Sequence, residues 1–86
     1  MEPRKENAME RKLEIGKDVV YVTPKGERRN ALVTAVWSDI GCNVVFVTAD
    51  ETKTDPYGRQ TERAASVIHK SQQPAPGNFW AWPDEA

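Results

Sequence analysis

Residue types that carry catalysis or hold metals are scarce in this sequence, which has one cysteine and one histidine among its 86 residues. A lone Cys42 cannot form a disulfide within the chain, and Cys42 with His69 does not complete a tetrahedral zinc site. A Cys–His pair for nucleophilic catalysis is formally available, but no motif places an Asn or Asp to orient the histidine. We therefore expect a protein that is not an enzyme and that has no metal site and no cofactor.

Long apolar runs and an excess of one charge sign are also missing. The mean hydropathy is -0.70, and the longest apolar stretches, such as 44–47, are far shorter than the ~18 residues of a membrane span. The first six residues lack the apolar core of a secretory signal, so we expect a cytoplasmic protein without a membrane partner. With 12 Lys and Arg against 13 Asp and Glu, the net charge of -1 disfavours a nucleic-acid partner, which needs a concentrated positive surface.

The hydropathy pattern divides the chain into three parts. Residues 1–14 are dense in charge and poor in apolar residues, which predicts a charged tail, with a short helix over 8–13 as the alternative. Residues 15–70 contain the β-branched segments of a small domain. Residues 71–86 are rich in proline and tryptophan, and we expect them to pack on that domain or on a neighbouring protomer.

The middle part reads as short strands separated by turns. Both faces of the second strand are largely apolar, which predicts a strand covered on both sides. The segment between the third and fourth strands is polar and is predicted to be a loop, without the glycine and terminal glutamate of a calcium loop. The predicted strands are 19–23, 31–37, 44–48 and 61–69, with turns at 24–26 and 38–43 and the loop over 49–59.

Four or five short strands in roughly 55 residues, with no strong helical pattern, favour an all-β fold, a small SH3-like barrel. A chain of this size buries only ~60% of the surface of its unfolded state. We therefore expect a homo-oligomer, in which contact between protomers supplies further burial.

The C-terminal segment is the most distinctive part of the sequence. Phe79, Trp80 and Trp82 crowd into four positions, and each stabilises the fold by ~1.5 to 3 kcal/mol when buried. Two interpretations stay open: structural packing, or an aromatic platform that stacks on a ligand.

The order of these motifs resembles a family of small SH3-like proteins of tailed bacteriophages and prophages. The resemblance covers about residues 15–86 and rests on Gly16-x-x-Val19-x-Tyr21-Val22-Thr23-Pro24-x-Gly26, on Ala31-Leu32-Val33-Thr34-x-Val36, and on Pro76-Gly77-x-Phe79-Trp80-x-Trp82-Pro83-x-Glu85. That family usually ends in Pro-Gly-x-Trp-x-Trp-Pro-Glu, commonly with His between the tryptophans. This chain departs from it in the added Phe79 and in Ala81 at the His position.

The resemblance implies a phage accessory protein acting in the host cytoplasm. We expect a non-enzymatic binding protein, and one concrete form is an anti-defence sponge that sequesters a nucleotide immune signal in pockets at oligomer interfaces. Such pockets need aromatic faces and cations, and the basic residues alternatively form only a solvated mixed surface. The candidate ligand-binding residues are Tyr21, Lys25, Arg28, Arg29, Tyr57, Arg59, Trp80 and Trp82.

Two other functions stay open at this point. An adaptor or inhibitor that binds a host protein could use the barrel face, the aromatic tail or the edge of a strand. A barrel that binds RNA or DNA is less favoured and predicts an affinity that falls with salt and rises with strand length.

Overall fold

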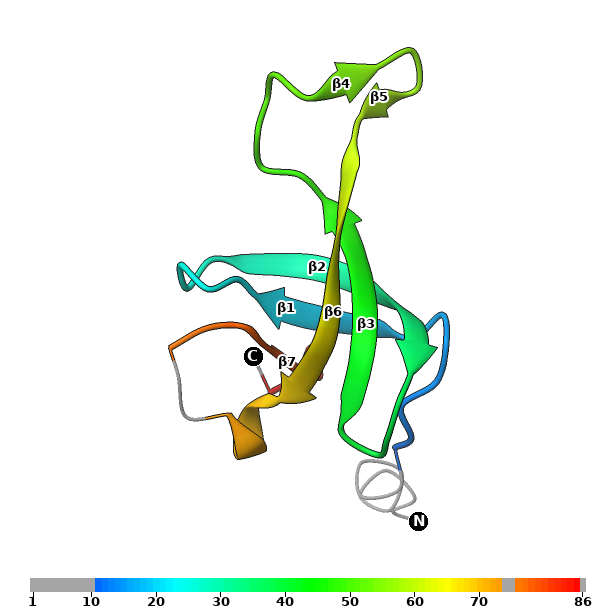
Figure 1. Ribbon diagram of the computed structural model, residues 1–86, viewed down its shortest axis with the longest axis vertical. Helices are drawn as coiled ribbons and strands as arrows, with labels where there is room; N and C mark the ends of the chain where they lie inside the picture. Colours follow the sequence, from blue (N-terminus) through cyan, green and yellow to red (C-terminus); the bar gives the residue numbers. More distant parts are fainter. Residues whose placement is uncertain (1–10, 74–75, 86) are drawn as a thin grey trace.

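The chain folds into an all-β domain whose centre is a closed barrel of five strands, in the order β1-β2-β3-β6-β7 (Figure 1). The computed structural model describes residues 11–73 and 76–85. The barrel strands are β1 Asp18–Val22, β2 Arg28–Val36, β3 Gly41–Val47, β6 Thr61–His69 and β7 Phe79–Ala81. The predicted SH3-like barrel is thus confirmed as an all-β closed barrel.

A small hairpin stands beyond one end of the barrel (Figure 1). It consists of β4 Thr54–Asp55 and β5 Gly58–Arg59, and it lies where a loop over 49–59 was predicted. That prediction missed these strands because they are polar and two residues long each. The Asp55 carboxylate accepts a hydrogen bond of 2.9 Å from the Tyr57 N–H and so fixes the turn at the hairpin tip.

The first turn forms as predicted, with Gly26 at φ +86° between β1 and β2. The Thr23 carbonyl accepts a hydrogen bond from the Gly26 N–H at 2.8 Å, and the Thr23 hydroxyl accepts one from the Glu27 N–H at 3.1 Å. The strand bounds differ mainly at the starts of β2 and β3. The strand β2 begins at Arg28, three residues before the predicted start at 31, and β3 begins at Gly41, inside the predicted second turn.

The core fills the barrel with alternate residues of its strands. Its members share the inner face and are mostly β-branched or aromatic: Leu13, Val19, Tyr21, Ala31, Val33, Cys42, Val44, Phe46, Val67 and Trp80. Leu13 belongs to the predicted tail, of which residues 1–10 lie outside the described part of the chain, as does most of the alternative helix over 8–13. The prediction that β2 is covered on both faces is wrong, because Leu32 on its outer face remains 48% exposed.

The C-terminal segment closes the barrel. Trp80 pairs with Tyr21 of antiparallel β1 and with His69 of parallel β6, so β7 joins the two ends of the sheet. Its indole is 2% exposed, donates a hydrogen bond of 2.8 Å to the Ile40 carbonyl, and meets the Trp82 ring edge-on at 5.0 Å between centroids. Within one chain, Trp80 is therefore part of the packed core, which agrees with the structural-packing interpretation of the aromatic segment.

The residues after β7 fold back on the barrel through Glu85. Its Oε1 accepts from the Trp82 N–H at 2.9 Å and lies 2.8 Å from His69 Nε2. The single-turn 3-10 segment Lys70–Gln72 follows His69, and the Lys70 amine donates to the Glu85 carbonyl at 2.9 Å. On the other side, the Arg11 guanidinium pairs with Asp84 at 2.7 Å. These contacts hold the C-terminal segment against β6 and residues 11–13.

Acid is expected to loosen this segment through Glu85. Burial raises the pKa of the carboxyl, but hydrogen bonds from His69 and the Trp82 N–H outweigh that effect and leave the pKa below its ordinary 4.5. A carboxyl group whose pKa is lower in the folded than in the unfolded state stabilises the fold when the pH is above the unfolded-state pKa. That stabilisation is lost as the pH falls through the folded-state pKa. We expect the urea midpoint to fall as the pH drops from above 4.5, and to fall less steeply in Glu85→Gln. Equal slopes in both proteins, or an equal flattening in the exposed-loop control Glu51→Gln, would contradict this.

Candidate functional site

A groove of about 440 Å³ lies between the β1–β2 turn and the part of the chain that leads to the β4–β5 hairpin. Its walls come from the turn, from the start of β2, from the segment after β3 and from the start of β6. The lining residues are Tyr21, Thr23, Pro24, Lys25, Glu27, Arg29, Phe46, Ala49, Asp50, Lys53, Glu62, Arg63 and Ala64.

The floor of the groove is aromatic and rigid. Tyr21 and Phe46 belong to the core, are 4% and 9% exposed, and lie 5.2 Å apart between ring centroids. The Tyr21 hydroxyl donates to Asn78 Oδ1 at 3.0 Å, and burial raises the pKa of Tyr21. These rings therefore offer the groove an apolar base and little open face for stacking.

The carboxylates of the groove already have partners within the chain. Glu27 binds the Arg29 guanidinium at 3.0 Å, and Glu62 accepts a short hydrogen bond from the Thr48 hydroxyl. The Asp50 carboxylate accepts from the Thr52 hydroxyl at 2.6 Å and from the Thr52 N–H at 3.0 Å. These hydrogen bonds, helped by nearby cations, hold the pKa of Asp50 below its ordinary value.

Two lysines of the groove have no such partner. Lys25 comes from the β1–β2 turn and Lys53 from the segment that precedes β4, so the two come from separate walls. Among the residues that the structure describes, neither amine forms a hydrogen bond or an ion pair. Arg63 at the start of β6 also lines the groove, and its guanidinium likewise forms no hydrogen bond or ion pair among the described residues. The groove thus combines an apolar base with three cations, Lys25, Lys53 and Arg63, that are available to an anion.

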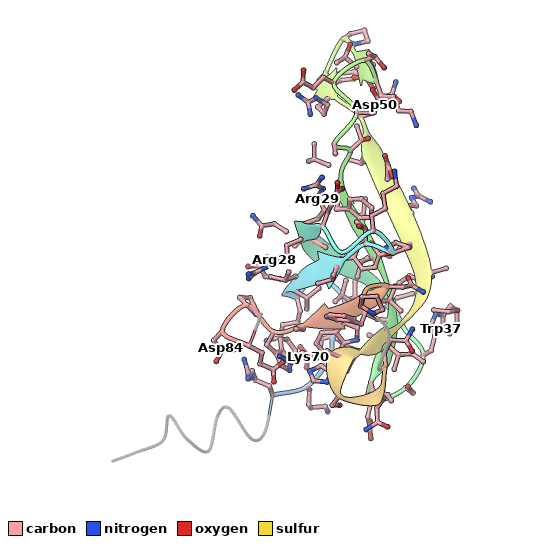
Figure 2. The ribbon with its side chains drawn as sticks, turned by 90° about the vertical axis from the view of Figure 1, so that its left-hand side faces the viewer. Arg28, Arg29, Trp37, Asp50, Lys70 and Asp84 are labelled. Atoms are coloured by element: carbon pink, nitrogen blue, oxygen red, sulfur yellow. The ribbon has the colours of Figure 1, made fainter. Side chains whose placement is uncertain are left out.

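The structure brings together three of the predicted ligand-binding residues, Tyr21, Lys25 and Arg29. In Figure 2, Asp50 lies toward the hairpin, with Arg28 and Arg29 nearer the barrel at the start of β2. Arg28 pairs with Val22 across the sheet, whereas Arg29 pairs with Tyr21 and so shares its side. Arg28 does not line the groove but lines a second hollow beside Val20 and Val47, which Arg29 also borders.

The other predicted residues lie outside the groove. Tyr57 is 98% exposed at the hairpin tip, and the Arg59 guanidinium of β5 donates to the Thr48 carbonyl at 3.2 Å. Trp80 is in the core, and Trp82 packs against it, with the Arg11 guanidinium 4.9 Å from its ring centroid. The predicted residues therefore do not form a single pocket in one chain.

Sequence reasoning missed Lys53 and Phe46 as groove residues. Lys53 stands among Asp50, Glu51 and Asp55, so the predicted loop looked acidic as a whole. Phe46 was assigned to a strand, and nothing in its neighbourhood along the chain indicates that it lies at the open end of the barrel.

The residues considered for catalysis are in structural positions. Cys42 is fully buried, and burial raises the pKa of its thiol to about 11, which leaves it a poor nucleophile. Nδ1 of His69 accepts from the Ser71 N–H at 3.2 Å, while its other ring nitrogen faces Glu85. Within 11–73 and 76–85, no group of three or more His, Cys, Asp or Glu side chains is placed to hold a metal ion.

Comparisons with known proteins give no further guidance on this site. In the part of the chain that the structure describes, no helix has the length and apolar character to cross a membrane. Searches against protein-family descriptions, curated proteins and solved structures found no match to the chain.

Proposed function

We propose that this chain is a non-enzymatic binding protein that holds a small anionic ligand, a nucleotide, in the groove between the β1–β2 turn and the hairpin. The observation that carries the proposal is the pair of partnerless amines, Lys25 and Lys53, on separate walls of a groove with an apolar base. Phosphate oxygens bind well to such donors, and the apolar base suits the ring system of a nucleotide.

Arg29 adds to the groove in a different way. Its guanidinium is held by Glu27 at 3.0 Å and by the Arg28 carbonyl at 3.1 Å, so its position is set before a ligand arrives. A donor fixed in advance loses less side-chain entropy on binding than a free one. We therefore assign Arg29 to orienting the ligand, and Lys25 and Lys53 to neutralising its charge.

The resemblance to phage proteins gives the proposal its biological form. A small binding protein made by a phage in the host cytoplasm would act by sequestration, and a nucleotide immune signal of the host is the ligand class that suits this role. Tight binding without turnover is all that sequestration requires, and the cations of the groove would supply it.

Reversing the charge of a groove lysine is expected to weaken nucleotide binding. A charge-assisted hydrogen bond contributes about 1.5 to 3 kcal/mol, so Lys25→Glu and Lys53→Glu should each weaken binding by roughly tenfold or more. Binding is measured by native mass spectrometry and calorimetry with ATP, cyclic AMP and cyclic dinucleotides as probes. The matched control is Lys12→Glu, which makes the same charge change at an exposed residue outside the groove.

Three results would refute the proposal. The first is that none of these nucleotides binds at millimolar concentration. The second is that both groove variants bind like the parent protein. The third is that affinity grows with the length of an oligonucleotide, which would indicate RNA or DNA binding instead.

A second candidate function is favoured by the hairpin. Tyr57 is 98% exposed at the tip of an element that stands beyond the barrel, and exposed tyrosines are frequent anchors of protein interfaces. Such a tip would suit an adaptor that binds a host protein. Nucleotide binding that depends on Lys25 and Lys53 would favour the first function over this one.

A further inference from the structure

The outer face of β2 and β3 carries apolar side chains that the barrel leaves uncovered. Leu32 is 48% exposed and Val47 is 54% exposed, with Val45 half-buried beside them. They line a shallow hollow of about 220 Å³ together with Asp18 of β1 and Thr61 of β6. A contiguous apolar patch on the surface of a small domain is a candidate for contact with a partner.

The strand register gives this face a direction. Asp18 pairs with Leu32, Leu32 pairs with Val45, and Val45 pairs with Arg63, so these four residues form one row across β1, β2, β3 and β6. Residues paired in this way project to the same side of the sheet. The row therefore runs from an anion through two apolar residues to a cation, over roughly 14 Å at the usual strand spacing.

The two charged ends of the row are open to a partner. Asp18 and Arg63 are both exposed, and within the described residues neither side chain forms a hydrogen bond or an ion pair. Asp18 lines the hollow at one end of the row. At the other end, Arg63 also borders the groove, and it projects to the same side of β6 as Thr61, two residues earlier, which lines the hollow.

We infer that this face is a homodimer interface, with the two-fold axis lying in the interface, parallel to β2 and β3 and between them. A rotation of 180° about that axis reverses the row. Asp18 then lies opposite the partner's Arg63, and Leu32 lies opposite the partner's Val45. Since a two-fold interface uses the same surface twice, this face fits a second copy of itself in charge and in apolar character.

Other occupants and other arrangements fit the row less well. A copy that met the face without reversing the row would place Asp18 against Asp18 and Arg63 against Arg63, which is repulsive. A purely acidic or purely basic partner would match one end and oppose the other. An apolar centre with a charged rim is the usual anatomy of a protein interface, and pairing also supplies burial that so small a domain lacks.

Sedimentation of the full chain over a concentration series tests the inference. We expect a monomer–dimer equilibrium in the parent protein. Asp18→Arg and Arg63→Glu should each weaken it by roughly tenfold or more, because each converts two attractive contacts into repulsive ones. Mixing these two variants should restore the dimer, since each reversed charge then meets an opposite charge on the other chain.

Matched controls make the same charge changes away from the row. Asp39 lies in the β2–β3 turn and Lys12 precedes β1. Neither Asp39→Arg nor Lys12→Glu should change the monomer–dimer equilibrium. Circular dichroism of every variant shows whether it is folded. The inference is overturned if the folded parent is monomeric at all concentrations, if the row variants dimerise like the controls, or if mixing the two charge variants restores nothing.

Discussion

Replacing Trp80 with alanine is expected to lower the free energy of unfolding by about 3 to 5 kcal/mol, the usual loss when a buried tryptophan is truncated. Trp80 is 2% exposed and contacts the rings of His69 and Trp82, with centroids 4.7 Å and 5.0 Å away. It also lies in the strand that closes the barrel. For so small a domain this loss is a large share of the total stability, and urea unfolding followed by circular dichroism would measure it.

Two further variants serve as comparisons for Trp80→Ala. Tyr57→Ala truncates an aromatic residue that is 98% exposed, and we expect a change of less than about 0.5 kcal/mol. Trp80→Phe keeps a ring in the core and should stay folded if the alanine variant does not. Its loss should be intermediate, because the Ile40 carbonyl still accepts from the His69 N–H at 3.0 Å. Equal stabilities of Trp80→Ala and Tyr57→Ala would show that β7 does not depend on this side chain.

Adding a methyl group at Gly77, by substitution with alanine, is expected to lower the free energy of unfolding nearly as much as Trp80→Ala does. A Cβ atom there would lie 1.9 Å from the Thr23 carbonyl oxygen and 2.9 Å from its carbon, both backbone atoms that no rotamer change can move. The next residue, Asn78, donates its N–H to the Val22 carbonyl at 2.6 Å, so the segment cannot retreat without losing that contact. We expect Gly77→Ala to cost about 3 kcal/mol and to lower the melting temperature by roughly 12 °C or more.

Gly58→Ala provides the matched control for that clash. Gly58 has φ +118°, but a Cβ added to it has no atom within 4 Å. This variant carries backbone strain of about 1 to 2 kcal/mol without a steric overlap, and the strain lies in the hairpin rather than in the barrel. A melting temperature of Gly77→Ala at or above that of Gly58→Ala would mean that the chain before β7 has room to shift.

The long strands could be predicted from the sequence because β-branched and aromatic residues gather in runs that are bounded by turn residues. The strand over 61–69 has the bounds that were predicted, and the Pro24-Lys25-Gly26 turn lies where its residues require. The strand β7 has three residues, too few for periodicity, and its partners in β1 and β6 cannot be found from local pattern. The aromatic content predicted burial there, but not a strand that closes the barrel.

The candidate site could be predicted only in part, because a groove depends on which side of a strand each residue faces. Arg28 and Arg29 are neighbours in the sequence, yet a strand sends them to opposite sides, and only Arg29 shares a side with Tyr21. Lys53 reaches the groove because the chain turns back between β3 and β6. The path of the chain there depends on contacts between segments that are distant in the sequence, and these contacts cannot be predicted from amino-acid composition.

The closure of the barrel by β7 also has a consequence for aggregation. This short strand covers the free backbone of β1 on one side and of β6 on the other. If it detached, two sheet edges would be exposed at once, each able to template strand addition by another chain. Three residues near position 80 therefore protect the protein from uncontrolled polymerisation, a role that is independent of any ligand.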